Sequence, residues 1–277
     1  DVLFLVYSLQ DYWKGSYNLS TLTSTYLTND VGNWFREQVA AHPEAKWRVA
    51  LVHKNVFSGS GHQEDEETPL FRETMLPIFK DCEIDLVLQG HDHCYEIIGP
   101  VDADTRTPIL NAISDVETVP MNMVSNMTGK KGGVFNVNDG TLYFIGATCG
   151  TKRYNPNHKL TMEADYEKHK VENYYDLFTG MFGQPGRPSY SSFTVDGNII
   201  TVNSYKVYEG MEPLLFNTFH IKRTREHTPY SEKAHKTLEQ MIQEYGTVKI
   251  LHNGNMLIVR ENIAYDTLGQ LKYDNRD

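Results

Sequence analysis

The chain has 277 residues, of which 40% are hydrophobic and 12% aromatic, and it carries a formal net charge of −10. This composition is typical of a globular protein with a sizeable core, in one large domain or two smaller ones. The negative charge and the lack of a Lys/Arg stripe argue against nucleic acid as the main partner, and no apolar run reaches the ~18 residues of a membrane-spanning helix.

The first third of the chain alternates apolar runs with amphipathic segments. Buried strands and surface helices of ordinary length account for this alternation. The expected elements are, in chain order, a strand at 2–7, a helix from the N-cap Asp30 to Pro43, a strand at 47–53, a helix at 68–80 and a strand at 84–88. Connections of this length predict parallel βαβ units, and therefore an α/β fold.

Residues 107–208 have a different sequence pattern, with short apolar runs separated by Gly and Asn. This pattern predicts antiparallel hairpins, and the strongest turn signal is the Asp-Gly-Asn at 196–198. A polar, Tyr-rich insertion at 154–188 is interpreted either as a helical excursion or as the rim of an active site.

Two domains are expected, one at 1–222 and one at 223–277. The second begins with a polar connector, continues with a predicted helix at 231–245 and ends in a small β-hairpin module. Because the chain starts inside an apolar strand, Asp1 is expected to be an internal start. The three cysteines do not form an obvious disulfide framework.

The sharpest local signal is Gly90-His91-Asp92-His93, directly after an apolar strand. Two histidines one residue apart face the same space only where the backbone turns, and Gly90 permits a turn. His53 ends the preceding strand 38 residues earlier, about one crossover away. Since the carboxyl ends of parallel strands meet at one edge, the three histidines are predicted to gather as metal ligands. The plain alternative is that each is a hydrogen-bonded loop histidine.

The segments VALVHKNVFSGSGH and DLVLQGHDHCYE resemble the late motifs of the calcineurin-like metallophosphoesterases, closest to the purple acid phosphatase branch. The resemblance extends over about residues 2–222. It implies part of an α/β sandwich of mixed sheets with flanking helices. It also implies that His53 and His91 bind one metal of a binuclear pair and that His93 binds the other.

The resemblance suggests further roles around these ligands. His62 lies where the purple acid phosphatase branch places a substrate-contacting histidine, which binds phosphate or assists the leaving group. A plain loop histidine is the alternative there. Tyr95 and Glu96 are expected to fix the orientation of the histidine rings without binding the metal, as hydroxyls and carboxylates next to metal ligands often do.

The activity implied by the resemblance is hydrolysis of phosphomonoesters or phosphodiesters by metal-activated water, with Fe, Zn or Mn in a binuclear centre. The Asp and Asn motifs that supply the other ligands in this family do not occur in this sequence. By itself the chain is therefore expected to hold one metal or none, with an N-terminal portion of the same protein missing. The alternative is a catalytically degenerate binding protein built on the same scaffold.

The tail ILHNGNMLIVRENIAYDTLGQLK is similar to short C-terminal β-modules of Bacteroidetes extracytoplasmic proteins. That similarity implies a periplasmic, surface or secreted location. The alternative is a hairpin that only decorates the main domain.

Overall fold

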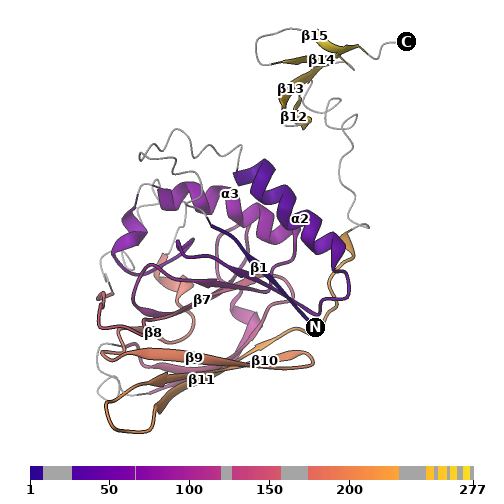
Figure 1. Cartoon of the computed structure of the whole chain (residues 1–277). Helices are drawn as coiled ribbons and strands as arrows, with labels where there is room; N and C mark the ends of the chain where they lie inside the picture. The colour runs from indigo at the N-terminus through magenta and orange to yellow at the C-terminus, as the bar shows by residue number, and fades with distance from the viewer. Residues whose placement is uncertain are drawn as a thin grey trace. The chain divides into compact units, whose positions relative to one another are not determined.

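The computed structural model describes most of the chain as two compact units, Asp1–Tyr230 and Ser231–Asp277 (Figure 1). The residues described are 1–8, 27–65, 67–119, 127–156, 174–230, 248–252, 255–260, 263–266 and 271–274. The predicted helix at 231–245 and residues 157–173 of the insertion at 154–188 lie outside these ranges.

The first unit is built on a six-stranded sheet, here called sheet A. Its strands are, in spatial order, β1 (Val2–Val6), β2 (Trp47–Leu51), β3 (Leu86–Gln89), β7 (Thr141–Gly146), β4 (Tyr95–Val101) and β8 (Phe182–Gly183). The first four strands pair in parallel, and β4 pairs antiparallel with β7 and β8. The predicted parallel βαβ units are therefore confirmed, and the carboxyl ends of β2 and β3 lie at one edge.

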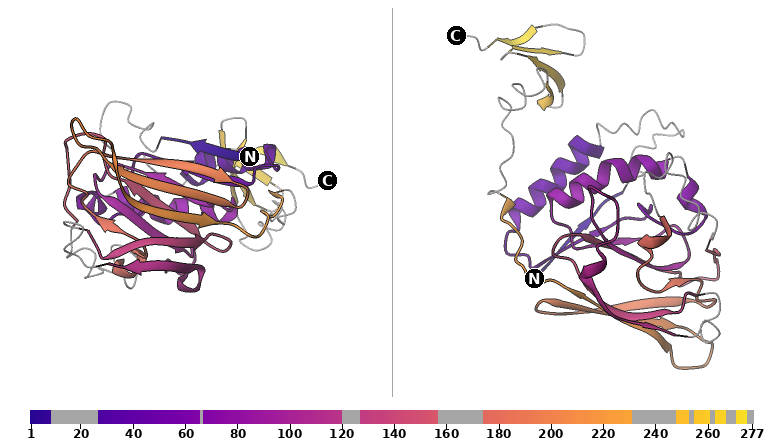
Figure 2. Two further views of the ribbon diagram at one scale, coloured as in Figure 1. Left: turned by 90° about the horizontal axis from the view of Figure 1, so that it is seen from below. Right: turned by 180° about the vertical axis from the view of Figure 1, so that it is seen from behind.

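Two helices cover one face of sheet A, α2 (Gly32–Ala41) and α3 (Glu67–Asp81) (Figures 1 and 2). A core of buried apolar residues fills the space between them and the sheet, including Phe35 and Phe79. The predicted N-cap at Asp30 is wrong. A π-helical segment, Leu27–Val31, runs directly into α2, so the backbone at residue 30 already lies within a helix and cannot cap one.

A second sheet, sheet B, packs on the other face of sheet A (Figure 2). Its strands are, in spatial order, β5 (Ile113–Thr118), β6 (Lys130–Asn136), β11 (Leu214–Lys222), β10 (Ile199–Lys206) and β9 (Ser189–Asp196). The predicted hairpin at 196–198 is confirmed, with Gly197 at φ +55° between β9 and β10. The antiparallel pairing expected at 107–208 is confirmed for β5 with β6 and for β9 with β10, whereas β7 joins sheet A in parallel with β3 and β6 also pairs in parallel with β11, which lies beyond that range.

Strand β7 has a particular effect on the histidine motif, because it lies between β3 and β4 in sheet A. The segment 90–94 must therefore cross from β3 to β4 over the end of β7, a distance of two strand spacings or about 10 Å. The amide of Ala147, just after β7, donates to the carbonyl of Cys94 at 3.0 Å. The end of β7 thus fixes the end of the histidine loop.

The second unit contains an antiparallel four-stranded sheet, which is larger than the predicted hairpin. Its strands are β12 (Val248–His252), β13 (Asn255–Arg260), β14 (Ile263–Asp266) and β15 (Leu271–Asp274). Among the described residues of both units, no helix has the length and apolar character needed to span a bilayer.

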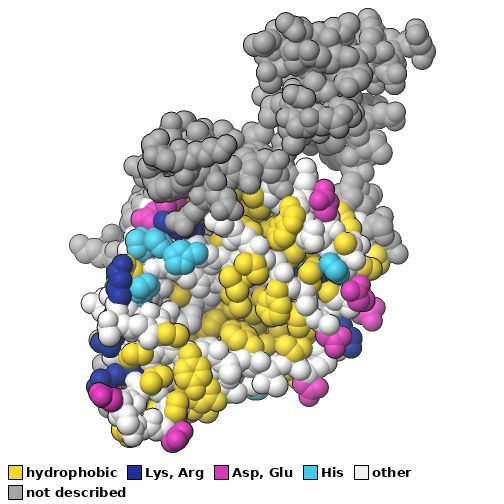
Figure 3. Space-filling view, viewed as in Figure 1, with side chains coloured by type: hydrophobic (Ala, Val, Ile, Leu, Met, Phe, Trp, Pro, Cys, Tyr) yellow, Lys and Arg dark blue, Asp and Glu magenta, His cyan; other side chains and the backbone are white. Residues whose placement is uncertain are grey.

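Apolar side chains are exposed along β1, the edge strand of sheet A. Phe4 and Val6 are 58% and 60% exposed, and Leu51 on the neighbouring strand is also exposed. Phe193 and Val195 on β9, the edge strand of sheet B, are exposed as well. Hydrophobic side chains accordingly form a broad patch on this side of the molecule (Figure 3).

We expect this edge to make the chain self-associate, because an apolar edge strand without a charged or proline guard is a template for pairing. Replacing Phe4 and Val6 together by threonine keeps the β-propensity and removes apolar surface. Sedimentation velocity over a tenfold concentration range should show weaker association for this variant. Met211→Thr, at an exposed turn residue, is the matched control. Identical sedimentation of all three proteins would contradict the prediction.

Candidate metal centre

The structure brings His53 and His91 into contact at the edge of sheet A where β2 and β3 end. Nδ1 of His91 lies 3.2 Å from Nε2 of His53, and the ring centroids are 5.1 Å apart at 72°. The strand ends hold both residues, since the amide of Gly90 donates to the carbonyl of His53 at 3.1 Å. Two ring nitrogens therefore face each other at a distance that one shared ion could span.

The turn that presents His91 is made by His91 itself. Its φ is +67°, in the left-handed region that histidine tolerates better than most residues, whereas Gly90 has no such positive φ. The interpretation that Gly90 supplies the turn is therefore wrong. Such a conformation is a local strain of the kind that clusters at functional sites.

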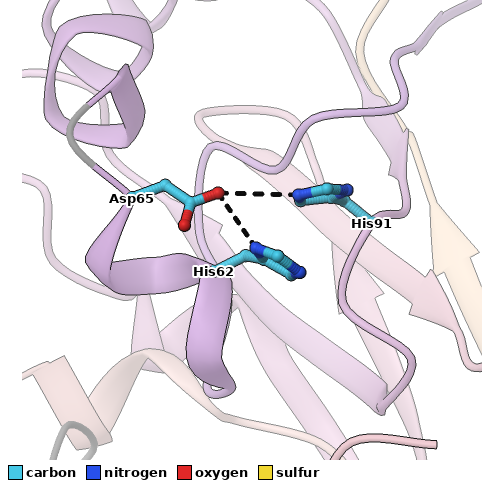
Figure 4. A group of neighbouring side chains, drawn as sticks. All are labelled: His62, Asp65 and His91. Atoms are coloured by element: carbon cyan, nitrogen blue, oxygen red, sulfur yellow. Dashed lines mark hydrogen bonds and ion pairs between the residues drawn. The ribbon is translucent and has the colours of Figure 1, made fainter.

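His62 and Asp65 approach His91 from the other side. Both belong to the turn around a 3-10 helix, Gly61–Glu64, and Nδ1 of His62 lies 2.9 Å from Oδ2 of Asp65. The rings of His62 and His91 have centroids 3.6 Å apart. One ligand atom from each of His62, Asp65 and His91 lies within 4.8 Å of the others, so this trio could hold a metal ion (Figure 4).

Lys54 also enters this cluster, next to His53 in sequence. Its Nζ lies 2.6 Å from Oε1 of Glu67, 3.2 Å from Oδ2 of Asp65 and 3.0 Å from Nε2 of His91. The lysine side chain is nearly buried. An ammonium group therefore already stands beside two of the three ligand atoms of the trio, and it would repel a metal ion placed there.

Asp65 and Lys54 were missed by sequence reasoning. Asp65 lies outside the segments that carry the resemblance, and Lys54 lies within the first of them. The available signals were the His-x-x-Asp spacing of His62 and Asp65, which places both on one turn, and the position of Lys54 directly after His53.

His93 lies on a different wall of the site. Its Nδ1 is 3.0 Å from the carbonyl of Lys152, which can only accept, so Nδ1 donates this hydrogen bond and Nε2 is the ring nitrogen that could bind an ion. The ring of Tyr154 is 4.8 Å from His93 and 5.4 Å from His62. The start of the predicted rim at 154–188 thus borders the histidines.

The electrostatic surroundings favour neutral imidazoles, the form that binds metals. Desolvation lowers the pKa of His91 to about 4, with a further contribution from the Lys54 ammonium. Desolvation, Lys54 and His93 lower the pKa of His53 as well. Desolvation raises the pKa of Asp65, but hydrogen bonds from Lys54 and His62 outweigh it, so this group stays a carboxylate. Burial raises the pKa of the Cys94 thiol, which keeps it protonated.

Asp92, between the two histidines of the motif, points inward and is fully buried. Its carboxylate accepts hydrogen bonds from Nδ2 of Asn55 at 3.1 Å, Oγ of Ser58 at 2.6 Å and the amide of His62 at 3.2 Å. Asp92 therefore ties the histidine loop to the segment that carries His62.

Glu96 supports the same segment from deeper in the core. Its Oε1 accepts from the amide of Gly59 at 3.0 Å and from Oγ of Ser58 at 3.3 Å. Desolvation, followed by repulsion from Asp92, raises the pKa of Glu96 to about 8. Glu96 thus acts on the site through Ser58 and Gly59, without touching a histidine ring among the described residues.

The structure places Tyr95 away from the histidines. Its hydroxyl lies 2.9 Å from Oγ of Ser204 and accepts from Nδ2 of Asn217 at 3.0 Å, and its ring is fully buried. These partners belong to sheet B. The expectation that Tyr95 supports the histidine loop is therefore corrected, because residues 95 and 96 alternate across β4 and only Glu96 faces the site.

Comparison with known proteins finds partial sequence matches to purple acid phosphatases. The chain is 35% identical over 85 residues to purple acid phosphatase 3 of Arabidopsis thaliana, and 30% identical over 100 residues to purple acid phosphatase 4 of the same plant. The chain resembles purple acid phosphatases. An uncharacterised protein of Mycobacterium tuberculosis is 30% identical over 91 residues. No protein-family model matches the chain.

The match to purple acid phosphatases is partial. It covers 30% of this chain and 21% of purple acid phosphatase 3, and 36% of this chain and 27% of purple acid phosphatase 4. The solved purple acid phosphatase PPD1 from yellow lupin seeds aligns with 86% of this chain and 34% of its own, with a TM-score of 0.48 and 16% identity. The chain thus spans about a fifth to a third of these relatives.

Proposed function

We propose that this chain carries the imidazole part of a metal centre that hydrolyses phosphate esters. The observation that supports it best is the 3.2 Å separation of Nε2 of His53 and Nδ1 of His91. An ion bonded to both nitrogens at ~2.1 Å would see them at roughly a right angle, as in ordinary coordination. The pair therefore fits a transition metal.

The other histidines have separate roles in this proposal. His93, with its proton held on Nδ1 by Lys152, offers Nε2 to a second ion. Nδ1–H of His62 donates a hydrogen bond to Asp65, so Nε2 is the nitrogen that, when it carries a proton, could donate to the phosphate or protonate the leaving group. When bound, the metals would lower the pKa of water and neutralise the charge of the transferring phosphoryl group.

The two-metal reaction needs carboxylate ligands beyond those that this chain brings to the histidines. We therefore propose that the chain alone holds one ion of Fe, Zn or Mn. The second ion would need ligands from an N-terminal portion of the same protein. An extracytoplasmic location stays a prediction that follows from the sequence of the tail.

A binding protein without catalysis is the second candidate. The observation in its favour is that Asp92, the acid nearest to the ligands in sequence, is buried and occupied by three donors. Such a protein would bind metal or phosphate and release no product.

The test combines metal content with hydrolysis of an aryl phosphate. After loading with Mn, Fe or Zn and exhaustive desalting, we expect one ion per chain, and loss of that ion in His53→Ala and His91→Ala. His42→Ala, at the exposed end of α2, should keep it. Equal metal content in all four proteins would refute the proposed centre. Retained metal with no hydrolysis, also after addition of an N-terminal portion, would favour the binding protein.

A further inference from the structure

The proton of His91 has two possible positions, and each has its own partner. On one side of the ring, Nδ1 lies 3.2 Å from Nε2 of His53. On the other side, Nε2 lies 3.0 Å from Nζ of Lys54 and 3.5 Å from Oδ2 of Asp65. A neutral imidazole has one N–H and one lone pair, so the neighbours select which nitrogen carries the proton.

Lys54 favours one arrangement. An ammonium group only donates, so a hydrogen bond from Lys54 requires a lone pair on Nε2 of His91. The proton then lies on Nδ1 and is donated to His53. In this arrangement Lys54, His91 and His53 form a continuous hydrogen-bond chain, and Nδ1 of His91 cannot bind a metal.

Asp65 favours the opposite arrangement. A carboxylate only accepts, so it pairs with a proton on Nε2 of His91 and leaves the lone pair on Nδ1. The Lys54 ammonium loses little stabilisation in this arrangement, because its shortest contact is the buried ion pair with Glu67 at 2.6 Å. Nδ1 of His91 and Nε2 of His53 are then both free to share one ion.

We propose that Asp65 is a positioning residue that favours the metal-binding tautomer of His91, and that Lys54 favours the competing tautomer, which prevails until a metal binds. This inference rests on the proposed metal pair of His53 and His91. It assigns Asp65 an orienting role, in contrast to direct ligation within the trio of Asp65, His62 and His91. The position of the Lys54 ammonium, between that trio and Glu67, supports the orienting role.

The first experiment reads the tautomer directly in the metal-free chain. Long-range ¹⁵N–¹H correlation spectra of ¹⁵N-histidine-labelled protein distinguish Nδ1–H from Nε2–H, and the His91 signal is identified by its loss in His91→Asn. We expect Nδ1–H in the wild type and a shift to Nε2–H in the double variant Lys54→Met/Glu67→Gln, which removes both halves of the ion pair. Unchanged tautomers in the double variant would overturn the proposal.

The second experiment measures zinc affinity by calorimetry at one fixed pH. Asp65→Asn should weaken binding by about 10–100-fold, as is usual when the partner of a ligating histidine is lost. The double variant Lys54→Met/Glu67→Gln should tighten binding by roughly tenfold, because the competing donor is gone. A general disturbance of the fold would weaken binding in both.

The two experiments separate this inference from the proposed function. If the wild-type chain binds no zinc, the metal pair fails, and the spectra of the metal-free chain alone decide on the tautomer. If zinc binds but Asp65→Asn binds it equally well, the metal pair stands and the positioning role of Asp65 is refuted. If Asp65→Asn loses zinc while its metal-free histidine spectrum matches the wild type and the double variant also loses it, Asp65 is a ligand and the proposal is wrong.

Discussion

Replacing Asp85 by alanine should lower the free energy of unfolding by about 3–5 kcal/mol, the usual cost of removing one partner from a buried ion pair. Asp85 is fully buried just before β3. Its carboxylate accepts from Nη1 of Arg223 at 2.7 Å and from the amide of Arg48 at 2.8 Å, and Nε2 of His227 lies 3.0 Å away. The substitution leaves the buried Arg223 guanidinium without this counter-charge where the chain leaves sheet B.

Urea denaturation at pH 7 measures this effect. The matched control is Asp139→Ala, because Asp139 also pairs with an arginine, Arg225, but both side chains of that pair are exposed. An exposed pair should contribute no more than about 1 kcal/mol. An equal loss of unfolding free energy in Asp85→Ala and Asp139→Ala would show that the buried ion pairs contribute no more stability than the exposed pair.

The variant Glu96→Gln should be more stable than the wild type at pH 8 and about equally stable near pH 4.5. Burial raises the pKa of Glu96 to about 8. Between the ordinary pKa of a glutamate and pH 8, the unfolded chain therefore loses a proton that the folded chain keeps. The wild type must lose stability as pH rises through this window, by up to about 1.4 kcal/mol per pH unit. Glutamine has no such proton to lose.

Chemical denaturation at half-unit pH steps from 4.5 to 8 gives the difference in free energy of unfolding between Glu96→Gln and the wild type. We expect it to grow to about 2–4 kcal/mol in favour of Glu96→Gln at pH 8. The exposed Glu73→Gln on α3 controls for the loss of one formal charge. A difference that stays constant across the whole range would mean that Glu96 does not hold its proton.

The parallel part of sheet A could be predicted from the sequence because its information is local. The runs at 47–53 and 84–88, apolar except at Arg48, His53 and Asp85, are typical of strands covered on both faces, and each is followed by a polar loop. The approach of His53 to His91 follows from the same pattern, since both side chains sit just past neighbouring strands.

The partners of these histidines could not be predicted in this way, because they meet through tertiary packing. Asp65 reaches His91 through a 3-10 turn, and Lys54 reaches it across two loops. The antiparallel interpretation failed for β7 for a related reason. The apolar run of β7 pairs in parallel with β3 and antiparallel with β4, and this choice of partners depends on strands far away in the chain.

The position of β7 between β3 and β4 also sets the order in which the site can form during translation. The histidine loop leaves the ribosome well before Thr141–Gly146, and at about 5–20 residues per second the delay amounts to several seconds. Until β7 is made and inserted, β3 and β4 have no strand to hold them apart. A nascent chain therefore exposes the Gly90–Cys94 loop without its final span, and the proposed metal centre can take its final geometry only after β7 has been made.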